Sequence, residues 1–149
     1  MSHEGLILHA GLVARRVKGR WLGALIEGPS GIGKSDLALR CLEAGATLVA
    51  DDRVLAWTDQ GRLWGRAPDP LAGLMEVRGV GIVRRPALAS CPIALIIDCQ
   101  PRAAAVERMP REAFAERLGV RLPVRPLWPF EPAAATKLLS LLDRVGHRG

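Results

Sequence analysis

The sequence predicts a single α/β domain, P-loop NTPase-like in type, over residues 1–149. A short apolar strand, a glycine-rich loop and an amphipathic helix follow one another directly between residues 22 and 44, which is the order that a phosphate-binding loop requires. Apolar segments of strand length recur along the chain, and a second helical pattern closes it. The length suits one domain with a sizeable core.

The glycine-rich loop matches the pattern G-x-x-x-x-G-K-[ST] in full, with the residues Gly28, Pro29, Ser30, Gly31, Ile32, Gly33, Lys34 and Ser35. Glycines allow backbone N–H groups to turn inward around phosphate oxygens. Lys34 supplies a cation for the β- and γ-phosphates, and the Ser35 hydroxyl can bind Mg²⁺. A strand at residues 22–26 and a helix at 36–44, which Gly45 ends, supply the context. The alternative is a glycine-rich turn that only resembles such a loop.

The segment before this unit, residues 6–14, is apolar apart from His9 and predicts one strand. A lone histidine in such a strand is more often packed in a core than catalytic. Residues 15–20 are rich in arginine and lysine and predict a basic hairpin turn that ends at Gly19.

Two adjacent carboxylates, Asp51 and Asp52, lie within a run at residues 47–57 that predicts a strand. Neighbours in a strand point to opposite faces, so only one of the two can face the loop directly. Burying an acid among apolar neighbours is unfavourable unless a cation or hydrogen bonds compensate. The alternative is a solvated turn between two strands.

Further segments predict a hairpin around residues 58–61, an extended run at 74–83 and a buried strand at 93–98. In the extended run Glu76 and Arg78 share one side, although a plain strand with a bulge fits as well. The buried strand ends in Asp98, an acid in the position of a Walker B carboxylate. Asp98 therefore competes with the Asp51–Asp52 pair as the acid near the phosphates.

The last third of the chain predicts a short helix at residues 110–118 closed by Gly119, an extended segment at 122–127, and a final helix at 132–145 ended by Gly146. The final helix carries an apolar stripe of Leu138, Leu141, Leu142 and Val145. Together with Trp128 and Phe130, this stripe gives more apolar surface than one small domain hides, so we expect a homo-oligomer.

Composition excludes several classes of protein. Hydrophobic residues make up 49% of the chain, no apolar run reaches the length of about 18 residues that a membrane span needs, and residues 1–8 lack the features of a signal peptide. We therefore expect a cytoplasmic protein whose three cysteines are reduced and buried. The net charge of +6 is scattered and is accompanied by no RNA-binding aromatic motif, so nucleic acid is not the expected partner.

Taken together, four stretches resemble the C-terminal catalytic domain of the HPr kinase/phosphorylase family, in a short form. They are Leu8-His9, the loop at 28–35, Val-Ala-Asp-Asp at 49–52 and Glu-x-Arg-Gly-x-Gly-Ile at 76–82, in the family's order. The resemblance covers roughly residues 6–145 and implies an α/β domain similar to phosphoenolpyruvate carboxykinase, usually assembled as a hexamer. It implies an ATP- and Mg²⁺-dependent serine kinase of the phosphocarrier protein HPr that regulates the phosphotransferase system, with a phosphorylase activity in the reverse direction.

The resemblance also implies roles for single residues. The loop would hold ATP, and Ser35 and Glu76 would bind Mg²⁺. Asp52 would accept the proton of the target serine, with Asp51 beside it. Asp98 becomes a structural strand end.

Two further assignments follow from the same resemblance, with His9 matching the family's active-site histidine and Arg108 a later arginine that stabilises the transferring phosphoryl group. The chain departs from the family where Leu127, Trp128, Pro129 and Phe130 replace a basic Gly-Arg-Asn segment, so we expect a weak reverse reaction.

Two other functions fit the same motif. A small-molecule P-loop kinase would normally need a lid with clustered arginines, for which the chain leaves little room. A non-catalytic nucleotide sensor would bind ATP and transfer nothing.

Overall fold

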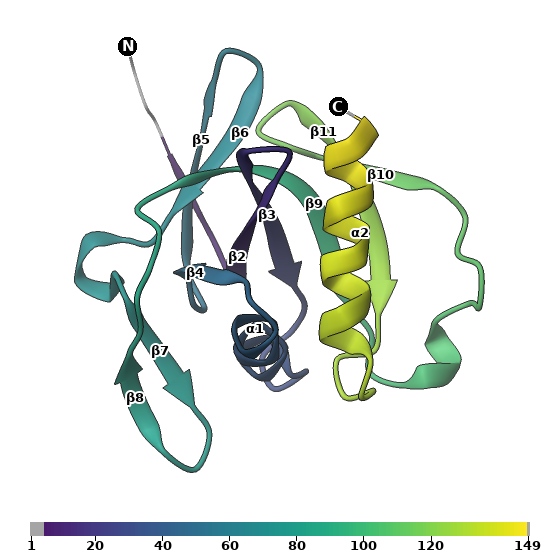
Figure 1. The fold of residues 1–149 in the computed structure, drawn as a ribbon, viewed down its shortest axis with the longest axis horizontal. Helices are drawn as coiled ribbons and strands as arrows, with labels where there is room; N and C mark the ends of the chain where they lie inside the picture. Colours follow the sequence, from purple (N-terminus) through teal and green to yellow (C-terminus); the bar gives the residue numbers. More distant parts are fainter. Residues whose placement is uncertain (1–4, 149) are drawn as a thin grey trace.

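The computed structural model of the protein describes residues 5–148, in which a twisted β-sheet carries two helices on one face (Figure 1). The strands are β1 (Leu6–Leu8), β2 (Ala10–Val17), β3 (Arg20–Glu27), β4 (Thr47–Ala50), β5 (Val54–Asp59), β6 (Arg62–Arg66), β7 (Leu74–Val77), β8 (Gly81–Arg84), β9 (Cys91–Cys99), β10 (Ala113–Arg117) and β11 (Val120–Leu127). The helices are α1 (Lys34–Glu43) and α2 (Ala134–Arg148), and short 3₁₀ turns lie at Asp69–Leu71 and Ala103–Ala105.

The centre of the sheet is the pair β3 and β9, which run parallel. Strand β11 extends the parallel arrangement beyond β9, while β2 pairs antiparallel with both β3 and β4. The beginning of β9 also pairs with β6, and the sheet continues from there through β5 to β1. The carboxyl ends of β3 and β9 therefore meet at one edge, where the glycine-rich loop begins.

Each face of this sheet buries its own core. Ile26 and Ile97 point to the face covered by α1 and α2, where Leu37 and Leu138 are fully buried. Their neighbours in sequence, Leu25 and Ile96, point to the other face, among residues of β2, β5 and β6. This division follows from the two-residue period of a strand, and it explains why the central strands read as continuous apolar runs.

The predicted mixed α/β fold is confirmed, and so are most of its elements. Strand β3, helix α1, the hairpin of β5 and β6, strand β9, the extended β11 and helix α2 lie where the sequence predicts them, within a few residues.

Two of the predicted strands are broken in the structure. Residues 6–14 divide at His9 into β1, which pairs with β5, and β2, which pairs with β3 and β4. Residues 47–57 divide at 51–53 into β4 and β5, so the two aspartates lie in a bend between strands. The prediction of one continuous strand was wrong in both cases, because each half pairs with a different neighbour.

The prediction of a single extended run at residues 74–83 was also wrong. It forms a hairpin of β7 and β8 that projects away from the sheet (Figure 1). Glu76 lies on β7 and Arg78 in the turn, so the two do not share the side of one strand.

The predicted helix at residues 110–118 is wrong, because most of this segment forms strand β10. Its residues Ala113–Arg117 pair antiparallel with β11, from Ala113 opposite Val124 to Arg117 opposite Val120. The turn between them contains Gly119, so this glycine ends a strand and not the predicted helix. Pairing with β11, which itself pairs with β9, outweighs the helical preference of the sequence.

Helix α2 does not end at Gly146 but continues to Arg148. Gly146 is buried within the helix, where an added Cβ would lie 2.5 Å from Cγ1 of Val17 and 2.8 Å from Cδ1 of Leu22. The glycine thus allows the helix to approach β2 and β3 closely. Leu138 and Leu142 are fully buried beneath the same helix, so the predicted apolar stripe is mainly internal core rather than surface for an oligomer.

The three cysteines are free and buried, as the sequence predicts. Burial raises the pKa of each thiol to about 12, so the thiols stay protonated at neutral pH. Among residues 5–148 no helix is both long and apolar enough to span a membrane.

The close approach of α2 to the sheet can be tested with a glycine-to-alanine substitution, whose usual effect on stability should here be reversed. Glycine to alanine inside a helix normally stabilises by about 0.5–1 kcal/mol. We expect Gly146→Ala to destabilise the protein instead, by about 1–3 kcal/mol, because the methyl group overlaps Val17. Urea unfolding measures the change. The control is Ser140→Ala, at an exposed position of α2, which we expect to be neutral or stabilising; a gain of stability in Gly146→Ala would contradict the packing argument.

Candidate active site

The glycine-rich loop connects the end of β3 to the start of α1. Gly31 and Gly33 have φ values of 83° and 108°, a left-handed region in which residues with a side chain are strained. The first helical hydrogen bond is donated by the Leu37 N–H to the Gly33 carbonyl, at 2.9 Å. The Lys34 Nζ donates to the carbonyls of Gly28 and Pro29, at 2.5 and 3.0 Å. The ammonium group is thereby held over the loop, beside the amino end of the helix.

Asp51 is buried next to this loop, with 9% of its surface exposed. Its Oδ1 accepts a hydrogen bond from the Ser35 hydroxyl at 2.8 Å, and its Oδ2 accepts one from the backbone N–H of Glu76 at 3.0 Å. Both carboxylate oxygens therefore have partners, as a buried carboxylate requires. One side chain connects the start of α1, the bend after β4 and strand β7.

Asp52, the next residue, is placed quite differently. Its side chain is 64% exposed, and its contact with Arg53 is a loose ion pair of 3.8 Å. Its φ of 67° is left-handed, which aspartate and asparagine adopt more readily than most residues. Its backbone carbonyl accepts a hydrogen bond from the N–H of Ala10, at 3.1 Å. Asp52 thus presents a carboxylate to the open space above the loop.

That space is a cavity of about 500 Å³, within the range of small-molecule sites. Most of its lining residues are polar. They come from the loop, α1, the Asp51–Asp52 bend, the β7–β8 hairpin and the segment after β11, and they are Ser30, Gly31, Gly33, Lys34, Ser35, Asp36, Leu39, Asp52, Glu76, Val77, Arg78 and Phe130.

The structure brings together most of the residues that the sequence analysis selected. Lys34, Ser35, Asp52 and Glu76 line the cavity, and buried Asp51 bonds to two of them, Ser35 and Glu76. His9 is exposed and does not line the cavity, although its neighbour Ala10 bonds to Asp52.

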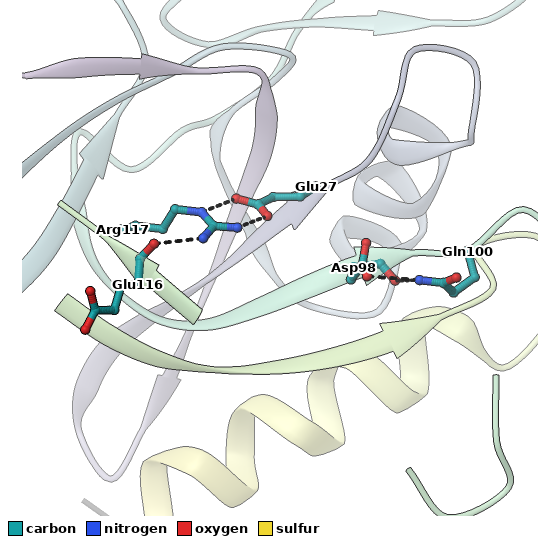
Figure 2. A network of polar contacts seen from close by, with 5 residues as sticks. All are labelled: Glu27, Asp98, Gln100, Glu116 and Arg117. Carbon is teal, nitrogen blue, oxygen red and sulfur yellow. Dashed lines mark hydrogen bonds and ion pairs between the residues drawn. The ribbon is translucent and has the colours of Figure 1, made fainter. Parts of the chain in front are cut away.

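Arg108 and Asp98, the other two residues that the sequence suggests near the phosphates, also lie outside the cavity lining. Arg108 is exposed in the connection between β9 and β10. Asp98 accepts a hydrogen bond at 3.0 Å from Gln100, as Figure 2 shows.

The ion pair of Glu27 and Arg117 is not predicted by the sequence. Glu27 is the last residue of β3 and precedes the loop, and Arg117 comes from β10. The guanidinium makes two bonds to the carboxylate, of 2.6 and 3.0 Å, and the two groups face each other in Figure 2. The hydrogen bond to Glu27 raises the pKa of Arg117 above its ordinary value, against the smaller effect of burial. This pair fastens the β10–β11 hairpin to the base of the loop, and only the pairing of β10 could have revealed it.

The oxygen groups at this site suit a hard divalent cation. The Ser35 hydroxyl and the Glu76 side chain both belong to the lining of the cavity, and Asp51 bonds to the Ser35 hydroxyl and to the backbone N–H of Glu76. Within the described part of the chain no three histidine, cysteine or acidic side chains are grouped so that they could hold a metal ion by themselves. This arrangement fits Mg²⁺, which keeps several waters and binds one or two protein oxygens together with phosphate groups.

Comparisons of the chain with a family model and with known proteins point to the same family. Residues 7–88, more than half of the chain, match the family model described as HPr Serine kinase C-terminal domain. An HPr kinase/phosphorylase from Streptococcus thermophilus is 52% identical over 63 residues, which are 42% of this chain and 20% of that protein. One from Clostridium tetani is 38% identical over 99 residues, which are 66% of this chain and 32% of that protein. The chain therefore spans a third or less of the length of these two relatives.

A solved structure has the same fold over nearly the whole chain. The Hpr(Ser) kinase/phosphatase from Coxiella burnetii superposes with a TM-score of 0.76, covering 96% of this chain and 90% of that one, at 23% sequence identity.

The bonds of Asp51 lead to a prediction about the β7–β8 hairpin. In Asp51→Asn the single amide oxygen can still accept a hydrogen bond from Ser35. The NH₂ group then faces the backbone N–H of Glu76, so the hydrogen bond from Glu76 is lost. We expect a loss of about 1–3 kcal/mol in stability and faster hydrogen exchange at the Glu76 amide. The control is Asp69→Asn, whose side chain is exposed. Unchanged exchange at Glu76 would show that Asp51 does not hold the hairpin.

Proposed function

Because the chain belongs to the HPr serine kinase C-terminal domain family, we propose that it is an ATP- and Mg²⁺-dependent serine kinase of HPr or a related phosphocarrier protein. The observation that carries the proposal is the bonding of Asp51 to Ser35 and Glu76 beside the glycine-rich loop. We propose further that residues 1–149 form one P-loop catalytic unit, similar to phosphoenolpyruvate carboxykinase. It would act in the cytoplasm in the regulation of the phosphotransferase system, as a homo-oligomer.

The phosphates of ATP would bind over the loop at residues 28–35. The glycines leave backbone N–H groups free to turn toward phosphate oxygens, and the Lys34 ammonium already lies above the loop. In this arrangement Lys34 stabilises negative charge on the β- and γ-phosphates. The cavity of about 500 Å³ is large enough for a nucleotide.

Ser35 and Glu76 are the residues that would hold Mg²⁺. Bound Mg²⁺ would neutralise the negative charge that develops on the transferred group. Asp51 orients both residues, through the Ser35 hydroxyl and the Glu76 backbone. Its own oxygens are occupied by these bonds, which makes it a positioning residue in this proposal.

Asp52 is the proposed base. It is the acid of the pair whose carboxylate is exposed to the cavity, and so it is accessible to the serine of a docked protein. In the transfer, the serine Oγ forms a bond to the γ-phosphorus, the bond from that phosphorus to the ADP oxygen breaks, and the serine proton passes to Asp52. By microscopic reversibility, protonated Asp52 returns the proton in the reverse reaction.

The proposed catalytic roles of His9 and Arg108 have less support from the structure, because neither residue lines the cavity. Each side chain is exposed outside the cavity lining, so each would have to reach the reacting groups in the complex with the protein substrate. The roles rest on the resemblance to the family.

The competing functions give different results in one transfer experiment. A small-molecule kinase would phosphorylate a nucleoside or a sugar, and Arg78 is the one arginine that lines the cavity among the described residues. A nucleotide sensor would bind ATP without transfer. Incubation with labelled ATP, Mg²⁺ and either HPr or a panel of nucleosides and sugars, followed by location of any phosphoserine, separates the three.

The first variant tests the loop. Lys34→Ala should abolish transfer and weaken ATP binding at least 10-fold, because it removes the cation at the β- and γ-phosphates. Isothermal titration calorimetry with ATP and Mg²⁺ measures the affinity. The control is Lys18→Asn, which removes one positive charge in an exposed left-handed turn that suits asparagine. Equal ATP affinities of the Lys34→Ala variant and the unaltered protein would refute the assignment of the loop.

The second variant tests the base. Asp52→Asn keeps a residue that adopts the left-handed backbone but removes the proton acceptor. We expect transfer in both directions to fall about 10²–10⁴-fold while ATP binding stays within a few-fold. Asp69→Asn again serves as the matched change at an exposed site. A transfer rate close to that of the unaltered protein would exclude Asp52 as the base.

A further inference from the structure

Phe130 occupies an unusual position for an aromatic side chain. It follows β11 in the segment that leads to α2, and 53% of its surface is exposed. Its ring lies against the last glycine of the loop, since an added Cβ at Gly33 would be 2.9 Å from its Cζ. It is the one aromatic side chain that lines the cavity among the described residues.

The backbone on both sides of Phe130 is fastened to α1 by one arginine. The Arg40 guanidinium donates to the carbonyl of Glu131 at 3.1 Å and to the carbonyl of Pro129. Its Nε donates to Asp36 at 3.0 Å, which holds the guanidinium in place. Lys137 pairs with the Glu131 carboxylate at 2.5 Å and secures the far side of the segment. The exposed ring is therefore carried by a fixed backbone.

The residues around the cavity indicate which end of a nucleotide would lie near this ring. Ser35, Asp52 and Glu76 are the lining residues to which the proposed function assigns the metal, the γ-phosphate and the acceptor serine. Phe130 touches Gly33 and shares the lining with Asp36 and Leu39, on the first turns of α1. Apolar Leu39 and the ring of Phe130 offer neither a charge nor a hydrogen-bond donor to a phosphate group, but both can pack against the flat surface of a base.

We propose that Phe130 is the platform on which the adenine ring of ATP stacks, held in place by Arg40 as a positioning residue. The inference rests on the proposed nucleotide site and adds the group that selects a nucleotide over a bare polyphosphate. A rigid ring that is already aligned loses little conformational freedom when the base binds.

The test compares ATP with inorganic tripolyphosphate, which has the same three phosphates and no base. Titration calorimetry in the presence of Mg²⁺ measures both affinities. We expect Phe130→Ala to weaken ATP binding about 5- to 100-fold, the range that loss of one base–aromatic stack gives, and to leave tripolyphosphate binding within 2-fold. Phe130→Leu keeps an apolar contact with Gly33 but has no flat face, and it should lose ATP affinity as well. Phe130→Trp should retain it.

The control is Phe114→Ala, the other phenylalanine of the chain, which lies on β10 with its ring beside Arg121 and outside this cavity. It should change neither affinity. Equal loss for ATP and tripolyphosphate in Phe130→Ala would overturn the proposal in favour of a loop-supporting role. An unchanged ATP affinity, or a change only in the mass of an oligomer, would overturn it as well.

The outcomes also separate this inference from the proposed function. If Lys34→Ala loses both ligands while Phe130→Ala loses neither, the phosphate loop stands and the platform does not. If the unaltered protein binds neither ATP nor tripolyphosphate, the proposed function fails, and the platform fails with it.

Discussion

The buried carboxylate of Asp51 is the interaction on which the arrangement of the site depends. A carboxylate removed from water must be compensated by hydrogen bonds, and here the partners are a hydroxyl at the start of α1 and a backbone N–H on β7. Neither partner is close to Asp51 in the sequence. The need to satisfy one acid therefore adds a polar link between three segments that also pack together in the core through Leu37, Leu48 and Met75. The β7–β8 hairpin is a two-stranded sheet of its own, so it depends on such links to the bend and on the burial of Met75.

Helix α1 also holds other segments around the site in place. Ser35 bonds to Asp51, Arg40 binds the segment around Phe130, and Glu43 forms an ion pair of 3.8 Å with Arg85 just after β8. The inner side of the same helix is fixed in the core through Leu37, Ala38 and Cys41. A rigid helix thus positions the segments around the proposed phosphate site from both sides. On the opposite face of the sheet, Arg117 binds Glu27 at the base of the loop, which restrains the loop's other end.

The sequence predicts well those parts of the structure that local pattern controls. The strand, loop and helix at 22–44, the buried β9 and the final helix each have a period or a motif that needs no distant partner to be recognised. It predicts poorly where pairing decides. Residues 113–117 have helical preferences, yet they form β10 because β11 offers an edge. Gly146 has the appearance of a helix stop, yet its role is set by Val17 and Leu22, which lie far away in the sequence.

The same distinction explains how much of the candidate site was predictable. The motif and the resemblance selected Lys34, Ser35, Asp52 and Glu76, all of which line the cavity. The residue pattern alone could not separate the two aspartates, because in a continuous strand either could face the loop, and only the resemblance favoured Asp52. The structure replaces that strand by a bend in which Asp51 turns inward and left-handed Asp52 stays exposed. The sequence indicates Phe130 only as apolar surface and could not place it at the site, since an aromatic residue after a proline gives no signal of its own. Its place beside Gly33 depends on Arg40, which holds the carbonyls on both sides of it. Two side chains of one helix, Ser35 and Arg40, thus hold two separate parts of the cavity lining, the Asp51–Asp52 bend and the segment around Phe130. The sequence reveals only Ser35, because it belongs to a motif.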